Sequence, residues 1–288
     1  MKRRMNTTLS RLTGMCMALA LACVPAGALA ADKGRIELPY VEWSSEVAST
    51  NVIRVVLEEA GYDVRLTSVS AAAMWQSVAS GDQDAFVAAW LPTTHGHYLK
   101  RVQDDVVDLG PNLEGTRIGL VVPEYVDIDS IAELNEHADR FGNQIIGIDP
   151  GAGIMSTTEK AIEAYGMDDM QLVEGSGATM TSVLGNAIRT KDWVVVTGWT
   201  PHWKFARWDL KYLEDPKGIY GGEETIHTIV RKGLKEDMPE AYAILDNFHW
   251  TPEQMAEVMV MNQEGGDPYE NAQRWVEENR DLVETWLP

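Results

Sequence analysis

Residues 35–90 read RIELPYVEWSSEVASTNVIRVVLEEAGYDVRLTSVSAAAMWQSVASGDQDAFVAAW, and this stretch predicts the fold class. Apolar runs suited to strands alternate with amphipathic segments suited to helices, and Gly61 and Gly81 follow the two amphipathic segments as stop signals. The expected strands are 35–41, 64–69 and 84–90, and the expected helices are 46–60 and 71–79. Helical crossovers join parallel strands, so the pattern predicts an α/β fold whose mostly parallel sheet is flanked by helices.

A second alternation of the same kind follows Pro123. The further expected strands are 118–123, 144–148, 172–174, 193–197 and 225–231, and the further expected helices are 131–141, 154–165 and 178–190, followed by helices to the C-terminus. Two such units predict a two-lobe clamp, with crossings at 120–126 and 227–232. We therefore expect residues 31–122 in lobe 1, 123–228 in lobe 2, and a return to lobe 1 over 229–288.

Residues 1–30 have the features of a secretory signal peptide. Basic residues precede an apolar run over 12–22, and Ala28-Leu29-Ala30 matches a cleavage signal ahead of Ala31. The apolar run is short for a membrane span. We therefore expect an exported, periplasmic protein that begins near Ala31.

Both cysteines, Cys16 and Cys23, lie inside this leader, so a mature chain would have none. That excludes disulfides, cysteine nucleophiles and thiolate metal sites. A lipidated Cys23 on a lipid-anchored extracellular form is the alternative. Ala20-Leu21-Ala22 fits a lipidation signal poorly, so simple cleavage is favoured.

The chain is strongly acidic, with 44 Asp and Glu against 24 Lys and Arg, four of which belong to the leader. A surface of this charge argues against nucleic acid and anionic lipid as partners. This charge does not argue against a small zwitterionic ligand.

Three tryptophans, Trp43, Trp90 and Trp199, each stand where an apolar run gives way to polar or turn-forming residues. Such strand ends carry ligand contacts in many α/β proteins. Indole faces attract cations, and a methylated ammonium cannot donate a hydrogen bond, so three rings predict an aromatic box for a quaternary ammonium group. The alternative is that all three rings belong to the core.

Residues 145–156, IIGIDPGAGIMS, form a strand, a glycine-rich turn and a helix start. Free N–H groups and the helix dipole near Gly153 and Ile154 favour an anion. The phosphate-binding sequence GxxxxGK[ST] is absent, and a carboxylate fits as well as a phosphate. The alternative is a tight turn without a ligand.

His95 follows Trp90 in a loop and could donate a hydrogen bond to a carboxylate. His95-Gly96-His97 lacks a second cluster of ligands at matching spacing, so no metal is expected. The sequence has no GxSxG or HExxH motif. Glu46 and Asp149 are interpreted as a helix N-terminal charge and a turn residue, and no catalytic residue is assigned.

Five segments together resemble the glycine betaine-binding proteins of the OpuAC type. They are Trp90-Leu-Pro-Thr-Thr-His95, Ile148-Asp-Pro-Gly-Ala-Gly-Ile-Met155, Thr197-Gly-Trp-Thr-Pro-His-Trp203, Lys211-Tyr-Leu-Glu-Asp-Pro-Lys217 and Ile226-His-Thr-Ile-Val-Arg-Lys-Gly233. The resemblance implies a type II periplasmic binding protein that closes on its ligand and delivers it to the permease and ATPase of an ABC transporter. Some members of this family are circularly permuted.

The resemblance also implies the site residues. The three-Trp cage corresponds to Trp43, Trp90 and Trp199, with Trp203 as a reserve candidate. The carboxylate contacts correspond to His95 and to the backbone N–H groups of Gly153 and Ile154.

We therefore expect a non-enzymatic, monomeric solute-binding protein that captures glycine betaine without a cofactor, for osmoprotection or nutrition. The alternative ligands are choline, carnitine, proline betaine and dimethylsulfoniopropionate. Choline lacks the carboxylate and would not need His95. An exported enzyme acting on a quaternary amine would need a positioned base or metal, and the sequence indicates neither.

Overall fold

The computed structural model describes residues 33–288, so the expected signal peptide and Cys23 lie outside the described residues. The strands in the described part are β1 (Arg35–Tyr40), β2 (Asp63–Ser68), β3 (Ala85–Leu91), β4 (Val106–Pro123), β5 (Gln144–Ile146), β6 (Gln171–Val173), β7 (Val196–Thr200), β8 (Leu210–Tyr212) and β9 (Glu224–Arg231). β7 begins three residues later than its expected strand, so Trp199 lies within the strand.

The α-helices are α1 (Ser44–Glu59), α2 (Ala71–Ser80), α3 (Gly96–Val102), α4 (Gly153–Tyr165), α5 (Gly177–Thr190), α6 (Lys204–Arg207), α7 (Leu234–Asp237), α8 (Pro239–Asn247), α9 (Pro252–Glu264), α10 (Pro268–Glu278) and α11 (Arg280–Val283). Short 3₁₀ helices are η1 (Ile131–Glu133), η2 (Asn135–Phe141) and η3 (Glu284–Trp286). The prediction of an α-helix over 131–141 is therefore wrong, because this stretch forms 3₁₀ helices. Its capping box is present, with Ser130 and Glu133 bonded reciprocally, but His137 leaves helical geometry at φ −116° and ψ 18°.

The α/β class is confirmed, but the sheets are mixed rather than mostly parallel. β1 and β2 form a parallel pair, whereas the larger sheet has the order β3-β9-β4-β7-β5-β6, with β8 also paired to β4. Within it, β9 runs antiparallel to both β3 and β4, and β4 runs antiparallel to β7. The prediction fails at β3 because that strand pairs with β9, which lies about 140 residues away in the sequence.

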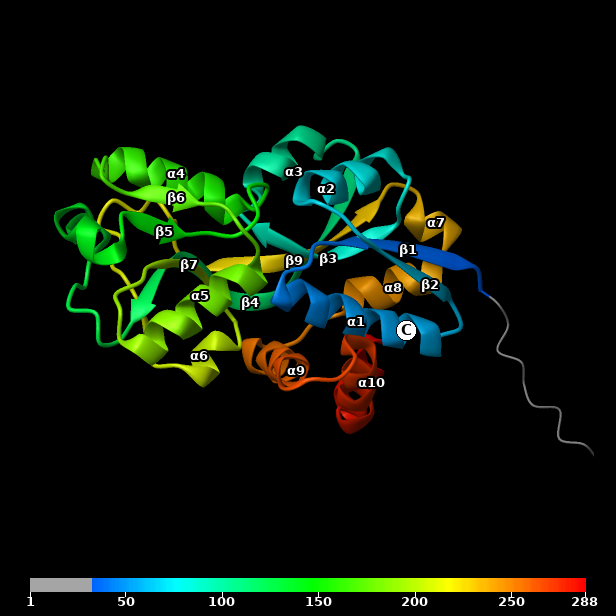
Figure 1. Cartoon of the computed structure of the whole chain (residues 1–288). Coiled ribbons are helices and arrows are strands. Elements are labelled where there is room, and N and C mark those ends of the chain that lie inside the picture. The colour runs from blue at the N-terminus through cyan, green and yellow to red at the C-terminus, as the bar shows by residue number, and fades with distance from the viewer. Residues whose placement is uncertain (1–32) are drawn as a thin grey trace, which may run out of the picture. The chain divides into compact units, whose positions relative to one another are not determined.

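β4 links two groups of elements, because it changes partner along its length. Val106–Thr116 pairs with β9, and Arg117–Val121 pairs with β7. We call the group around β3, β9 and the first part of β4 the β9 side, and the group around β5, β6, β7 and the last part of β4 the β7 side. Figure 1 shows α1 and α2 with the β9 side, and α4 and α5 with the β7 side.

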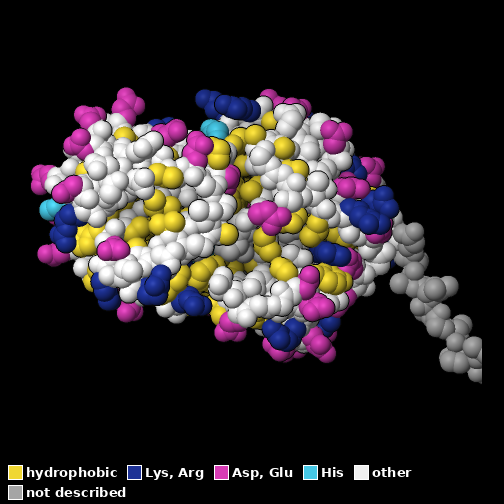
Figure 2. Space-filling model, viewed as in Figure 1, with side chains coloured by type: hydrophobic (Ala, Val, Ile, Leu, Met, Phe, Trp, Pro, Cys, Tyr) yellow, Lys and Arg dark blue, Asp and Glu magenta, His cyan; other side chains and the backbone are white. Residues whose placement is uncertain are grey.

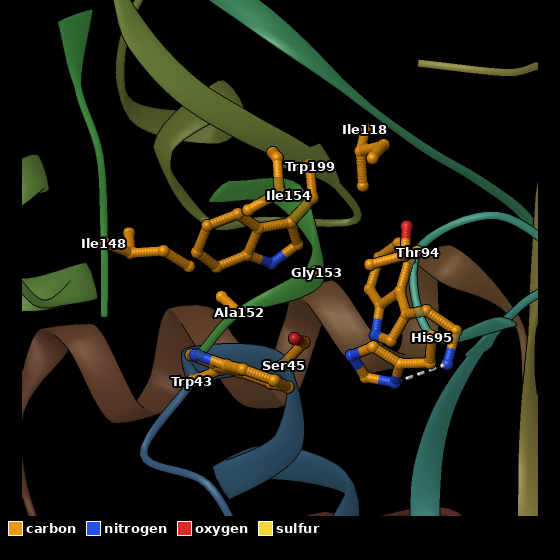
Figure 3. Close-up of a pocket in the computed structure, with 11 residues that line it drawn as sticks. Trp43, Ser45, Thr94, His95, Ile118, Ile148, Ala152, Gly153, Ile154 and Trp199 are labelled. Carbon is orange, nitrogen blue, oxygen red and sulfur yellow. Dashed lines mark hydrogen bonds between the residues drawn. The ribbon is translucent and has the colours of Figure 1, made fainter. Parts of the chain in front are cut away.

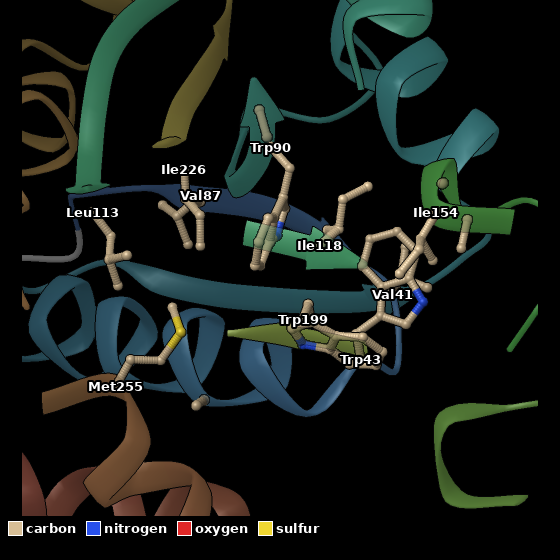
Figure 4. Close-up of a cluster of buried hydrophobic side chains, with 14 of the residues drawn as sticks. Val41, Trp43, Val87, Trp90, Leu113, Ile118, Ile154, Trp199, Ile226 and Met255 are labelled. Carbon is tan, nitrogen blue, oxygen red and sulfur yellow. The ribbon is translucent and has the colours of Figure 1, made fainter. Parts of the chain in front are cut away.

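The core reaches the tryptophans singled out in the sequence. Trp90 and Trp199 are each only 5% exposed, and they belong to the same buried cluster as Val87, Ile118 and Ile226 (Figure 4). Burial of rings this large contributes strongly to stability. The rings therefore belong to the core, and membership of the core does not prevent the same rings from also lining a pocket.

The outer surface carries the charge that the composition predicts. Asp and Glu side chains are spread over the face shown in Figure 2 and do not gather in one patch. Between residues 33 and 288, none of the helices combines the length and apolar character needed to cross a bilayer.

Candidate functional site

All six residues predicted as ligand contacts line a single pocket. The complete lining is Trp43, Ser45, Trp90, Thr94, His95, Ile118, Ile148, Ala152, Gly153, Ile154 and Trp199. Trp43 and Trp199 extend toward the space from opposite sides, and His95 lies at its edge (Figure 3). A small pocket that is mainly apolar, with few polar groups, is typical of a small-molecule site.

The three rings come from three elements and are nearly enclosed. Trp90 lies in β3 opposite Ile226 of β9, and Trp199 lies in β7 opposite Ile118 of β4. Trp43 occupies the N-cap position of α1, with extended backbone at φ −82° and ψ 138°. Each ring is 5–6% exposed. Strand pairing thus holds two rings in place, and a helix start holds the third.

His95 is held in one tautomer by its own loop. Its Nδ1 accepts a hydrogen bond from the Trp90 backbone N–H at 3.1 Å, while its backbone N–H donates to the Trp90 carbonyl at 2.8 Å. Because Nδ1 is an acceptor, the proton of the neutral ring sits on Nε2. The side chain is 1% exposed, and burial lowers the pKa of His95 to about 3. His95 is therefore a neutral N–H donor at physiological pH.

Gly153 and Ile154 open helix α4, where the first backbone N–H groups have no partner within the helix. The N-cap residue, Ala152, offers no side-chain cap, and the first turn contains no acidic residue. This end of the helix is therefore suited to an anion. A Cβ built on Gly153 would come within 2.1 Å of the Thr94 carbonyl oxygen, so only glycine permits this approach.

Hydrogen bonds beside the pocket join the β9 side to the β7 side. The Trp43 indole Nε1–H donates to Asp149 at 2.7 Å, and the Tyr98 hydroxyl donates to the Gly151 carbonyl at 2.8 Å. Asp149 was interpreted as a turn residue, and that interpretation is incomplete, because its carboxylate also orients a pocket ring. Its place directly after a strand and before a glycine-rich turn was the only signal in the sequence.

His202 makes a further contact across the two sides. Its Nδ1 accepts from the Lys204 backbone N–H at 3.1 Å, so its protonated Nε2 faces the Ser44 hydroxyl at 3.1 Å. The ring also meets Trp199 edge-on at 4.7 Å between centroids. Burial lowers the pKa of His202 well below its usual value, and the nearby Lys204 adds to this effect. His202 thus braces Trp199 as a neutral ring.

Sequence reasoning missed five lining residues and kept one residue that does not line the pocket. The missed residues are Ser45, Thr94, Ile118, Ile148 and Ala152. Thr94, Ile148 and Ala152 lie in segments that carry the family resemblance, Ile118 pairs with Trp199, and Ser45 follows Trp43 by two residues, but none of the five was assigned a contact. Trp203, the reserve candidate, packs instead against His202 and Trp208 at centroid distances of 5.3 and 5.4 Å.

Two ionisable groups are fully buried close to the rings. Glu46 lies in the first turn of α1, and no side chain among the described residues hydrogen-bonds its carboxylate oxygens. Burial raises the pKa of Glu46 well above its usual value; the Val41 backbone N–H opposes this shift, and Asp149 and Glu42 add to it. The Lys204 ammonium lies 4.5 Å from the Trp199 ring centroid, and burial lowers the pKa of Lys204 well below its usual value. Burial favours the neutral form of both groups.

Within residues 33–288, no group of three or more His, Cys, Asp or Glu side chains is arranged to hold a metal ion. The pocket's chemistry is therefore that of three ring faces, one neutral imidazole donor and one free helix N-terminus.

Comparison with known proteins points to one family. Residues 34–278 match the family described as the substrate-binding domain of the ABC-type glycine betaine transport system. A glycine betaine/carnitine transport binding protein of Listeria monocytogenes is 56% identical over 150 residues. That match covers 51% of this chain and 50% of the Listeria protein, so it spans about half the length of that relative.

Two solved structures are similar over most of the chain. The lactococcal OpuAC, in a closed conformation with glycine betaine, is 44% identical with a TM-score of 0.85, and the match covers 88% of this chain and all of the other. The glycine betaine/L-proline-binding protein ProX of Borrelia burgdorferi is 42% identical with a TM-score of 0.86, covering 88% of this chain and 97% of the other. These are non-enzymatic binding proteins of the type II periplasmic fold. The chain belongs to the family of substrate-binding domains of ABC-type glycine betaine transport systems.

Proposed function

We propose that this protein captures glycine betaine and presents it to the permease and ATPase of an ABC uptake system. The observation that carries the proposal is the lining of the pocket, which combines two kinds of group. They are the three tryptophan rings, here called the aromatic end, and the neutral His95 imidazole with the uncapped start of α4, here called the polar end. Glycine betaine has a trimethylammonium head and a carboxylate tail. Its two ends match the two ends of the pocket.

The trimethylammonium head would lie among Trp43, Trp90 and Trp199. A methylated cation has no N–H to donate, so ring faces are its best partners in an enclosed site. Each desolvated contact contributes on the order of 1–2 kcal/mol. The small exposure of all three rings supports contacts of this desolvated kind.

The carboxylate tail would accept hydrogen bonds from His95 Nε2–H and from the N–H groups of Gly153 and Ile154. The tautomer of His95 supports a donor role, and the uncapped start of α4 supports an anion. Three donors satisfy a carboxylate that has left water, which offsets its desolvation.

The ligand would bridge the two lobes expected from the sequence, 31–122 with 229–288 and 123–228. Trp43, Trp90 and His95 would then belong to one lobe, and Ile154 and Trp199 to the other. A ligand that touches both lobes binds best to the closed state and stabilises it. Delivery to a membrane permease implies a periplasmic location.

The first test is isothermal titration calorimetry of the purified protein with glycine betaine, followed by choline as a competitor. Tight one-to-one binding of glycine betaine with weak binding of choline is the expected result. Equal or tighter binding of choline would remove the carboxylate role of His95, Gly153 and Ile154. If neither ligand bound, the three tryptophans would be core residues only. Carnitine is the second ligand to test, because the Listeria relative is named for it.

A further inference from the structure

A single buried carboxylate holds the loop that carries His95. Glu224 accepts hydrogen bonds from the backbone N–H groups of Thr93 and Thr94 at 2.7 and 2.8 Å, and also from the Thr94 hydroxyl. Glu224 is 1% exposed and lies about 130 residues away in the sequence. Charge-assisted bonds of this kind are the strong ones, and removing the acceptor would leave buried donors unsatisfied.

Glu224 stands at a junction in the sheet. It is the first residue of β9 and pairs in register with Thr116, at the point where β4 leaves β9 and begins to pair with β7. The segment before β9 also touches the loop, since a Cβ on Gly221 would come within 2.7 Å of the Thr93 hydroxyl oxygen. The strands that link the two sides thus hold the pocket loop directly.

The loop that Glu224 holds contributes to the polar end of the pocket. Thr94 lines the pocket, and its carbonyl oxygen is the atom against which Gly153 is seated. His95 is the next residue. Trp90 is bonded through its backbone to His95, but pairing of β3 with β9 also holds it without the Glu224 bonds. A shift of residues 93–95 would therefore move His95 and the contact at Gly153 more than it moves the Trp90 ring.

We propose that Glu224 is a positioning residue for carboxylate recognition. It fixes the positions of His95 and of the Thr94 carbonyl against which Gly153 packs, and it thereby favours a ligand with a carboxylate over one without. Glu224 does not line the pocket and acts through the loop. This inference rests on the proposed function, and it goes further by naming the source of the selectivity.

The test compares Glu224→Leu, which keeps the bulk but has no acceptor, with Glu224→Gln, whose amide oxygen still accepts from both backbone N–H groups. We expect Glu224→Leu to weaken glycine betaine by about ten-fold or more and choline by less than about three-fold. Glu224→Gln should restore glycine betaine affinity to within about three-fold of the wild type. Thr116→Val is the matched control, because this buried hydroxyl has no hydrogen-bond partner in the described part of the chain. It should leave both affinities unchanged.

A second pair of variants keeps the test decisive if Glu224→Leu does not fold. Thr94→Val removes the hydroxyl that donates to Glu224, and Thr94→Ser retains it. The valine variant should weaken glycine betaine more than choline, and the serine variant, which keeps the bond to Glu224, should bind glycine betaine more tightly than the valine variant does. Equal losses for both ligands in Glu224→Leu or Thr94→Val, or an unchanged glycine betaine affinity, would overturn the proposal.

Hydrogen exchange at the Thr93 and Thr94 amides separates this inference from the proposed function. We expect slow exchange in the ligand-free wild type and fast exchange in Glu224→Leu. If the wild type bound no betaine, the proposed function would fail, and the exchange rates would still report whether Glu224 holds the loop. Fast exchange in the wild type would refute the positioning role whatever ligand is bound.

Discussion

The two ends of the pocket are built in different ways. At the aromatic end, side chains project from elements fixed by strand pairing or by a helix start, and each ring is also part of the core. At the polar end, the groups that face the pocket are backbone N–H groups and one imidazole, whose positions depend on a loop, a glycine and a buried carboxylate. The aromatic end is therefore expected to set affinity for any quaternary ammonium ligand. The polar end is expected to select among such ligands.

The largest expected effect is at Gly153, which packs against the backbone of Thr94. Gly153→Ala would place a Cβ 2.1 Å from the Thr94 carbonyl oxygen, a backbone atom that cannot move aside on its own. We expect glycine betaine affinity to fall by about 100-fold or more, since binding needs the closed arrangement. Isothermal titration calorimetry of the Gly153→Ala variant with glycine betaine measures this loss of affinity.

Gly151→Ala is the control for the Gly153 variant, because its Cβ would meet nothing closer than an Asp149 oxygen at 3.8 Å. It should bind like the wild type. Equal behaviour of the two alanine variants would show that the Thr94 contact does not govern closure.

The second effect tests the aromatic end. Trp90→Ala removes one ring face and should weaken glycine betaine and choline alike, by about ten-fold or more. Trp193→Ala is the control, since that ring packs on Phe141 and Arg140, away from the pocket. A Trp90→Ala protein that binds glycine betaine as well as the wild type would return Trp90 to a purely structural role.

The third effect tests the polar end. His95→Leu removes the Nε2–H donor and should weaken glycine betaine by about ten-fold while changing choline little. Because burial lowers the pKa of His95 to about 3, the ring stays neutral above that pH. Wild-type glycine betaine affinity should therefore be flat between pH 5 and 8. A step near pH 6.5 that disappears in His95→Leu would contradict a neutral donor.

The smallest expected effect is at Glu46, and it tests whether a bound cation needs a buried negative charge beside the rings. The folded-state pKa of Glu46 is raised above its usual value of 4.5, so its contribution to stability is complete below pH 4.5 and declines as the pH rises. Glu46→Gln cannot ionise, and its melting temperature should exceed that of the wild type by an increasing margin from pH 5 to 8. Glycine betaine affinity should stay within about two-fold, because burial favours a neutral Glu46. A large loss of affinity would instead assign Glu46 a role as counter-ion to the ligand.

Local sequence signals predicted most elements because their causes are local. The capping boxes at Ser130 and Thr251 are present, and most expected strands and helices agree with the structure to within a few residues. The six candidate contacts were also identified from the sequence and its resemblance to a family, and they meet in one pocket. Their binding roles stay a proposal until ligand titrations are made.

Contacts between distant segments were decided by the tertiary structure alone. The antiparallel pairing of β3 with β9, the bond from Trp43 to Asp149 and the three bonds to Glu224 each join residues more than 100 positions apart. No periodicity or spacing carries that information, because it arises only when the sheet brings separate segments together. The order of the residues established which chemical groups were available and on which kind of element they lie. Tertiary packing decided which of them were brought together, buried and oriented, and burial in turn set the pKa values on which their chemistry depends.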